Sequence, residues 1–339
     1  MKKVLALSLF LSTVFMQGKI GGYAIFDYNG TTQQFDIDRT YFQYTNDISD
    51  NLFFKVRFDV GRSYEQFFGC TSTNYINNEE DCIASEQEWV DMADGTDSKL
   101  QVYLKNAYAD WKFNSGGKFS MGLIGTNSYG VQEKNWGYRF ISKSVLDMYG
   151  MTKTADFGIG YSHNFGDFNM SFQAVNGEGY KADFDSGNTN DDKPAAYVRL
   201  MYGEKNLLKD NGFNAGLIYI SRYNAIDDKH NNNVFGVFGG WRESNFRLGF
   251  EFNKKEYSSK ETATSLYLNY NFNGNIDLFA RYDVYNPNTS YNTIESKTIW
   301  GLVFNPTKGL YISPNAIISD AGDGTSAVKE YRLTCMFKY

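Results

Sequence analysis

The chain has 339 residues and a formal net charge of -6, and 17% of its residues are aromatic. Nucleic acid is an unsuitable partner for an acidic chain, because phosphate binding requires a basic surface. The mean hydropathy is -0.47, and after residue 18 no apolar run approaches the roughly 20 residues that a membrane-spanning helix needs. Composition therefore argues against nucleic-acid binding and against a fold built on transmembrane helices.

The chain begins with a pattern typical of a signal peptide, residues 1–18. Met1 to Lys3 form a short basic region, and Val4 to Met16 form an apolar run that is too short to span a bilayer comfortably. Gly18 is the best candidate for the last residue removed. The alternative is a buried core strand or helix. The signal-peptide interpretation leaves residues 19–339 as the mature domain.

Short segments of alternating apolar and polar residues fill the chain after residue 19. In the last of them, Tyr331, Leu333, Cys335, Phe337 and Tyr339 alternate with polar residues. Side chains on a strand alternate between its two faces, so each segment predicts a strand with one apolar face. We predict sixteen strands, at residues 21–28, 35–44, 52–62, 100–113, 118–126, 155–165, 168–176, 195–203, 213–223, 233–242, 246–257, 262–272, 276–285, 296–304, 310–319 and 327–339.

The connections between these strands alternate in length. Most turns after even-numbered strands are tight, whereas most loops after odd-numbered strands are longer; the short first outer loop, residues 29–34, and the nine-residue 204–212 turn are exceptions. Outer-membrane barrels show this asymmetry, with short periplasmic turns and long outer loops. The sequence therefore predicts an all-β, transmembrane antiparallel barrel in the outer membrane of a Gram-negative-type bacterium, contacting its lipids and with both termini in the periplasm.

The first long outer loop, residues 63–98, contains two of the three cysteines. Cys70 and Cys82 lie in one polar stretch, and export makes a disulfide between them plausible. Cys335 lies on the apolar face of the last strand, where a thiol behaves as a small hydrophobe. A metal site would need further ligands, and the chain has only two histidines. We therefore expect no metal ion and no cofactor.

The fourth strand does not keep one alternation throughout. Leu104 favours one parity, whereas Ala107, Ala109 and Trp111 favour the other. One extra residue in a strand reverses the facing of every side chain that follows it. A β-bulge near Asn106 would therefore reconcile the two halves of the strand.

The second long outer loop, residues 127–154, is rich in aromatic residues and in charges of both signs. Long irregular loops in compact domains are usually functional or disordered. This loop either folds into the barrel and narrows it, or it is an ordinary surface loop. In the first case, the candidate constriction residues are Glu133, Lys134, Arg139, Lys143 and Asp147.

The free-energy cost of placing a charge in lipid predicts which way the charged side chains face. An Arg or Lys on the lipid face at mid-membrane costs about 2–4 kcal/mol, so charged side chains should face the lumen. In strand 246–257, this places Phe246, Leu248 and Phe250 outward. The candidate luminal charges are Arg57, Asp59, Arg199, Arg222, Arg247, Glu251, Asp277, Arg281, Asp283 and Arg332.

Several stretches resemble a known family. FDIDRTYFQYTNDISDNLFFKVRFD (35–59), LKNAYADWKF (104–113) and FSMGLIGT (119–126) resemble the opening of porins of the phosphate-selective porin O/P type. WGYRF (136–140), ADFGIGY (155–161) and NGEGY (176–180) are similar to a branch of that superfamily. The resemblance implies a homotrimer of sixteen-stranded barrels whose third outer loop, residues 127–154 here, folds inward as a constriction. The inward arginine ladder and lysine cluster of selective members do not align residue by residue with this chain.

Three functions are compatible with such a barrel. The first is passive diffusion of small hydrophilic solutes or ions, with a possible preference for anions or phosphate. The second is surface recognition, as in an adhesin or receptor, with residues 63–98 as the binding element and a lumen closed by loops. The third, an enzyme, would rely on Ser162, His163 and Asn164, but neighbours on a strand point to opposite faces. We therefore expect a porin and no enzymatic activity.

Overall fold

The computed structural model describes residues 18–62, 68–70, 89–91, 100–181, 193–224, 229–257, 259–288 and 294–339. The predicted signal peptide, apart from Gly18, lies outside the described residues, and so does the predicted Cys70–Cys82 disulfide. No helix within the described ranges is long and apolar enough to cross a membrane.

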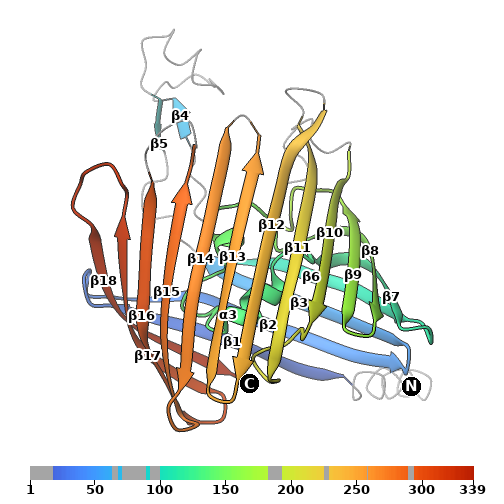
Figure 1. Ribbon diagram of the computed structural model, residues 1–339, viewed down its shortest axis with the longest axis horizontal. Coiled ribbons are helices and arrows are strands. Elements are labelled where there is room, and N and C mark those ends of the chain that lie inside the picture. Colours follow the sequence, from blue (N-terminus) through green and yellow to red (C-terminus); the bar gives the residue numbers. More distant parts are fainter. Residues whose placement is uncertain are drawn as a thin grey trace, which may run out of the picture.

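Within the described residues, sixteen antiparallel strands close into one barrel (Figure 1). This confirms the predicted fold class. The strands are β1 (Lys19–Asn29), β2 (Gln34–Ser49), β3 (Leu52–Arg62), β6 (Leu100–Lys112), β7 (Gly117–Gly125), β8 (Ala155–Phe165), β9 (Phe168–Val175), β10 (Ala195–Gly203), β11 (Gly212–Asn224), β12 (Lys229–Glu243), β13 (Phe246–Glu256), β14 (Lys260–Asn271), β15 (Ile276–Asn286), β16 (Glu295–Thr307), β17 (Leu310–Asp320) and β18 (Val328–Lys338). The short strands β4 (Phe68–Cys70) and β5 (Trp89–Asp91) pair separately.

Most strand boundaries lie within three residues of the prediction, and two differ by more. β2 continues to Ser49, and β12 begins at Lys229, where the sequence predicted a loop as far as Asn232. Both strands have polar ends, which pair with their neighbours: Asp47 lies opposite Phe53, and Asn232 lies opposite Arg222. Polar residues at a strand end satisfy the same ladder of backbone hydrogen bonds as apolar ones, so hydrophobic alternation marks only the central part of each strand.

The last strand closes the barrel against the first. β18 pairs with β1 from Tyr23–Lys338 to Asn29–Arg332. Tyr339 extends this seam, because its N–H donates to the Gly22 carbonyl at 3.1 Å and its carbonyl oxygen accepts from Gly22 N at 3.2 Å. A closed sheet leaves no strand edge with unpaired backbone groups, which is required where the strands lie in hydrocarbon.

The two ends of the barrel differ. The turns 50–51, 166–167, 244–245 and 308–309 lie at the end where β1 starts and β18 finishes, at the bottom of Figure 1. The strand ends that the longer connections join lie at the opposite end. The connection 204–211 belongs to the first end, which we call the short-turn end, and is its longest described connection.

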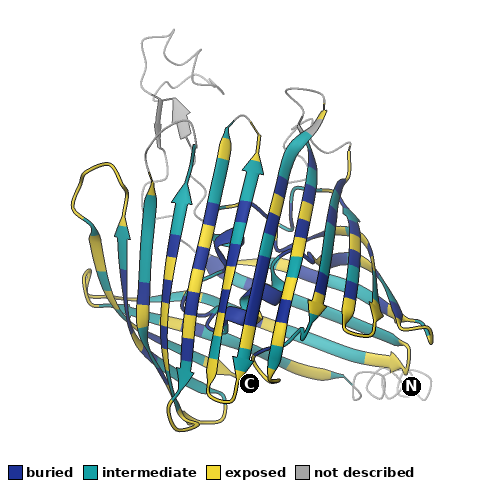
Figure 2. Ribbon diagram, viewed as in Figure 1, coloured by how far each residue is buried: buried dark blue, intermediate teal, exposed yellow. Residues whose placement is uncertain are grey.

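The two faces of the wall differ as the alternation predicts. Along β13, the outward side chains Phe246, Leu248 and Phe250 are 48%, 41% and 46% exposed, whereas the inward Glu251 and Asn253 are 1% exposed. Figure 2 shows the same alternation of exposed and buried residues along neighbouring strands. The barrel is therefore apolar on its outer surface and polar inside, the reverse of a water-soluble barrel.

The bulge predicted near Asn106 is confirmed. Arg57 pairs with Asn106 and Phe58 with Leu104, so that Lys105 is the extra residue. As a result, the adjacent side chains of Lys105 and Asn106 are both buried inside, at 5% and 4% exposure.

The sequence did not predict a second irregularity, in β2. There Ile25 pairs with Arg39 and Phe26 with Ile37, which leaves Asp38 as the extra residue. The shift turns Arg39 and Tyr41 into the lumen, where Tyr41 is only 3% exposed. The two bulges therefore place additional cationic and aromatic side chains on the inner wall.

Candidate functional site

The 126–154 segment, which joins β7 to β8, lies against the inner wall of the barrel. Its base is closed by a hydrogen bond of 3.2 Å from Thr126 N to the Thr154 carbonyl. Its two helices, α3 (Gly130–Trp136) and α4 (Val145–Met148), contact β12, β13 and β14 across the barrel (Figure 1).

Trp136 at the end of α3 anchors the segment. Its side chain is 1% exposed. The ring lies 5.6 Å from that of Tyr267 and 5.7 Å from that of Phe279, both in the wall, and 5.4 Å from that of Tyr138 in the segment. The indole Nε1 donates to the Ser142 carbonyl at 3.0 Å. Trp136 is therefore held in place both by burial of its ring and by the hydrogen bond of its indole N–H.

Four inward-facing arginines donate hydrogen bonds to the backbone of the segment. Their contacts are Arg199 to the Asn127 carbonyl (3.1 Å), Arg222 to Met151 (3.0 Å), Arg247 to Asn135 (2.9 Å) and Arg281 to Lys143 (2.7 Å). The sequence placed these four side chains in the lumen but gave no indication of these partners. They connect successive parts of the segment to the wall, from its beginning to its end.

The C-terminus of α3 packs closely against Arg247 of the barrel wall. Gly137 ends the helix in the left-handed conformation, with φ of 89°, and its N–H donates to the Glu133 carbonyl at 2.8 Å. This positive φ favours glycine, and a Cβ on Gly137 would lie 2.2 Å from Arg247 Nη2, so that a larger residue would displace the arginine. Arg247 Nη2 and Asn269 Nδ2 both donate to the Trp136 carbonyl at 3.1 Å. The guanidinium also complements the negative end of the helix dipole.

Three of the candidate luminal charges, Arg281 among them, lie beneath α4 and are closed off from the lumen. Glu251 accepts a hydrogen bond of 3.1 Å from Val145 N, at the first residue of α4. Arg281 and Asp283 form an ion pair of 2.7 Å, and both side chains are 0% exposed. These charges hold the segment in place and do not face open solvent.

A pair of buried amides offers a direct test of how the segment is attached. Asn135 and Asn214 donate to each other, at 2.8 and 2.9 Å, and are 0% and 3% exposed. We expect Asn135→Ala to destabilise the attached segment by about 1–3 kcal/mol, because it removes the donor to the buried Asn214 Oδ1, whereas Asn214 Nδ2 keeps the Glu204 carbonyl. Hydrogen exchange at residues 130–141 measures this. In a double-mutant cycle, Asn214→Ala should add less in the Asn135→Ala background than alone; simple additivity would contradict a direct contact.

The candidate constriction residues form one cluster, with one exception. Arg139 Nε lies 2.6 Å from a Glu133 carboxylate oxygen, and its Nη2 lies 3.5 Å from Asp147. Burial raises the pKa of Glu133, although Arg139 opposes this. Burial lowers the pKa of Lys143, and Asp147 opposes this shift.

Lys134 is the exception, since it faces another part of the lumen. Burial, followed by the charges of Arg199 and Lys209, lowers its pKa, whereas Glu204 has the opposite effect. Its electrostatic neighbours therefore belong to β10 and to the 204–211 connection, and it does not join the Arg139 cluster.

The wall formed by β2, β3 and β6 presents a basic and aromatic cluster around Tyr41. The cationic groups of Arg39, Arg57 and Lys105 lie 5.9, 5.2 and 5.0 Å from its ring centroid. Asp59 pairs with both Arg39 (3.4 Å) and Lys105 (3.7 Å). Only Arg57 and Asp59 were predicted, because the two bulges decide the facing of the others.

Arg57 differs from the other cations of this cluster. Its Nε and Nη2 donate to the uncharged Gln43 Oε1, at 2.9 and 2.5 Å. Among the described residues, no carboxylate lies within ion-pairing distance of its guanidinium. The positive charge of Arg57 is therefore not neutralised by the wall.

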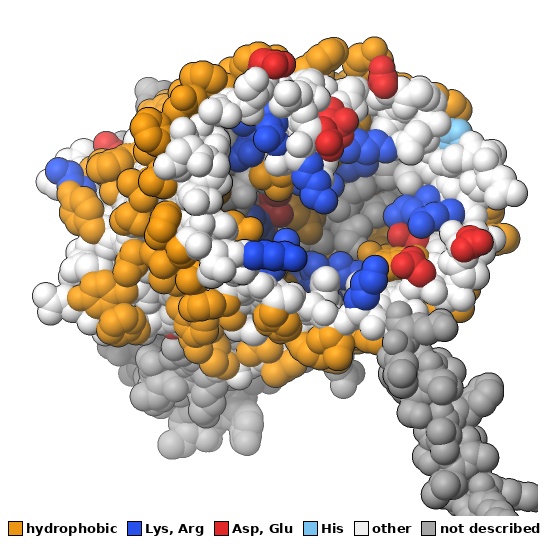
Figure 3. Space-filling model, turned by 90° about the horizontal axis from the view of Figure 1, so that it is seen from below, with side chains coloured by type: hydrophobic (Ala, Val, Ile, Leu, Met, Phe, Trp, Pro, Cys, Tyr) orange, Lys and Arg blue, Asp and Glu red, His pale blue; other side chains and the backbone are white. Residues whose placement is uncertain are grey.

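Two cavities open in the short-turn half of the lumen. The first, of about 380 Å³, has the cations Arg57, Arg139 and Lys338 in its lining, and none of its described lining residues is Asp or Glu. The second, of about 440 Å³, is lined by the cations Lys209, Arg242, Arg247 and Lys338 and by the acid Asp277. Gly137, Phe140, Leu208, Met336 and Lys338 line both cavities, and we call the joined space the vestibule. Figure 3 shows Lys and Arg side chains around the hollow at this end.

The 204–211 connection forms part of the vestibule. Leu207 is 0% exposed, and its carbonyl accepts from Arg242 Nη1 at 3.1 Å. The neighbouring Leu208 is 41% exposed and approaches Gly137 of the 126–154 segment. The sequence marked this connection as unusually long, and the structure shows that it contributes to the lumen.

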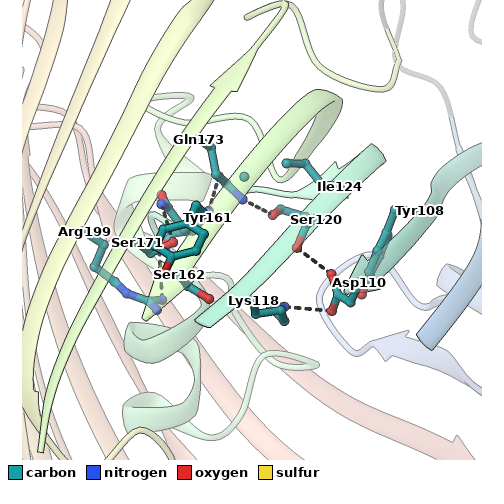
Figure 4. A pocket seen from close by; sticks show the side chains of 13 residues that line it. Tyr108, Asp110, Lys118, Ser120, Ile124, Tyr161, Ser162, Ser171, Gln173 and Arg199 are labelled. Carbon is teal, nitrogen blue, oxygen red and sulfur yellow. Dashed lines mark hydrogen bonds and ion pairs between the residues drawn. The ribbon is translucent and has the colours of Figure 1, made fainter. Parts of the chain in front are cut away.

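A smaller cavity of about 180 Å³ lies along the wall from β6 to β10 (Figure 4). Lys118 pairs with Asp110 at 2.7 Å, and Arg199 Nη2 donates to Asn169 Oδ1 at 2.9 Å. Ser162 lines this cavity, whereas the ring of the adjacent His163 lies 4.2 Å from that of Phe165, tilted by 39°, on the other face of β8. The two side chains point away from each other, as a strand requires.

Comparison with protein-family models and with curated proteins finds no match. Solved structures do match over nearly the whole chain. OmpT of Vibrio cholerae has a TM-score of 0.58 at 13% identity and covers 95% of this chain and 97% of its own. Salmonella typhi OmpF in complex with daunomycin has 0.59 at 12%, with 95% and 97% covered. A mutant Rh. blastica porin has 0.57 at 12%, with 95% and 100% covered. The chain has the fold of outer-membrane porins. At these identities the likeness shows the fold alone.

Proposed function

We propose that the chain is an outer-membrane porin that gives small hydrophilic solutes and ions passive passage. The observation that carries this is the polar, charged lumen, which holds open cavities beside the inward 126–154 segment. A barrel with an apolar exterior and a polar interior suits a water-filled path through a bilayer. The porin fold supports the proposal.

The 126–154 segment would form the constriction. It faces the Tyr41 wall with the Glu133, Arg139 and Asp147 cluster, and Arg139 and Tyr41 both interact with Tyr23. The four arginine contacts and Trp136 would keep this segment in a single position. We therefore expect a pore of constant width.

Planar-bilayer recordings test the proposal. The folded protein should add conductance in equal steps, because each inserted pore carries the same current. Protein that is shown to be folded and inserted, yet never conducts, would contradict it.

The vestibule favours anions over cations. The chain as a whole carries -6, yet the described residues that line the two cavities include one acidic side chain, Asp277, and six cations: Arg57, Arg139, Lys209, Arg242, Arg247 and Lys338. A pore lined by one sign of charge raises the local concentration of the opposite ion. The proposal is therefore an anion-preferring pore. The narrower phosphate preference, which the family resemblance would bring, stays a prediction.

Two further parts of the proposal follow the porin fold. One of the similar solved structures is described as the trimer form of Vibrio cholerae OmpT, and we extend a homotrimeric assembly to this chain as a proposal. We also propose that both termini face the periplasm, because β1 starts and β18 ends beside the short turns.

Neither alternative function gains support from the described residues. Surface recognition relied on residues 63–98, of which the structure describes only 68–70 and 89–91. The enzyme hypothesis relied on Ser162 and His163, which lie on opposite faces of β8. We therefore propose diffusion alone.

A further inference from the structure

We infer that the vestibule is a binding site for organic monoanions that carry an apolar body, such as aromatic carboxylates. The inference rests on the proposed pore, through which such a solute would reach the site, and names a solute class for it. It follows from the presence of cations without an acidic partner and of apolar side chains in one partly enclosed space.

The cationic side of the site is provided by Arg57 and Lys338. Both line the 380 Å³ cavity, and none of the ion pairs found among the described residues involves either side chain. Arg139, the third cation of this cavity, is already paired with Glu133 and Asp147. A carboxylate in the cavity would therefore meet Arg57 and Lys338 without competing with an acid of the protein. Charge-assisted hydrogen bonds of this kind are roughly twice as strong as neutral ones.

The apolar side is provided by Leu208, Met336 and Phe140, which line both cavities. Leu208 is 41% exposed in the open vestibule. Covering its side chain with an apolar body removes hydrocarbon surface from water, which favours binding. Met336 adds a flexible, polarisable surface that adapts to rings of different shape. An inorganic anion has no apolar surface that could pack against these three side chains.

The size of the site also fits this class. Cavities of about 380 and 440 Å³ lie in the range of roughly 300–1,000 Å³ that is typical of small-molecule sites. Gly137 borders both cavities, where a larger residue would collide with Arg247 and Leu208. One enclosed region therefore offers a charged end and an apolar end to one molecule.

Benzoate is the probe that tests the site, measured by calorimetric titration of the folded, detergent-solubilised protein. We expect saturable benzoate binding that is much tighter than that of acetate, which lacks the ring, and of benzamide, which lacks the charge. Leu208→Ser should weaken benzoate binding by about ten-fold, since it removes most of one apolar side chain from the contact. Arg57→Gln should weaken benzoate and acetate alike.

The controls separate this inference from the proposed function. Lys308→Gln removes an exposed cation in the 308–309 turn at the same barrel end, outside both cavity linings, and should leave benzoate binding unchanged. A protein that conducts chloride but binds acetate as tightly as benzoate, or whose Leu208→Ser variant binds benzoate unchanged, would overturn the inference and leave the pore intact. Benzoate binding to a protein that never conducts would support the site and refute the pore.

Discussion

Replacing Trp136 by alanine should release the 126–154 segment from the barrel wall. The side chain is 1% exposed and touches the rings of Tyr138, Tyr267 and Phe279. Truncating a buried tryptophan costs about 3–5 kcal/mol, from lost apolar burial and from the cavity left behind. That cost falls on the attachment of the segment, because the barrel strands are held by their own hydrogen-bond ladders. We therefore expect a barrel that still folds and inserts, with a mobile constriction.

Single-channel recordings provide the measurement. The Trp136→Ala pore should show a larger mean conductance and additional current fluctuations, as the segment leaves the wall and returns. Hydrogen exchange at residues 130–141 should rise in parallel, which reports local opening. Trp300→Ala is the matched control, since Trp300 is 51% exposed on the outer face of β16. Equal effects of the two variants would contradict a role for Trp136 in holding the constriction.

Reversing two charges in the vestibule should invert the ion preference. Arg57→Glu combined with Lys338→Glu changes the charged lining of the 380 Å³ cavity from three cations to one cation and two acids. Because ion selectivity in a pore follows the sign of the charges around its path, the variant should favour cations. The reversal potential in a salt gradient should therefore change sign, and the effect should diminish at high salt, where charges are screened.

The matched control carries the same change in net charge elsewhere. Lys260→Glu combined with Lys308→Glu alters two exposed lysines outside the cavity linings, one at the start of β14 and one in the 308–309 turn. This variant should keep the original sign of the reversal potential. An inversion in the control as well would mean that overall charge, and not the vestibule, sets the preference.

The barrel itself was predictable because its signal repeats along the chain. A period of two, the cost of charge in lipid and alternating connection lengths led to sixteen strands and to their facing. The bulge at Lys105 was found because one strand broke the alternation. The bulge in β2 is also visible in the sequence as a break in the alternation. Phe35, Ile37 and Arg39 are spaced two residues apart, so a regular strand would turn Arg39 toward lipid together with Phe35 and Ile37. An extra residue at Asp38 removes that conflict.

The site was less predictable because its contacts join residues far apart in the chain. Arg247 and the Asn135 carbonyl, for example, are 112 residues apart. Strand alternation and the cost of charge in lipid predict that an arginine faces the lumen. They do not predict whether its partner there is water, an acidic side chain or a backbone carbonyl. The role of the 204–211 connection was hidden for the same reason, since its length alone does not say which way it folds.

The reversal potential of the unmodified protein in a potassium chloride gradient tests the proposed function most directly. We predict stepwise conductance and a reversal potential with the sign that chloride diffusion sets, because the vestibule is lined mainly by cations. A reversal potential set by potassium, or inserted protein that does not conduct, would contradict it.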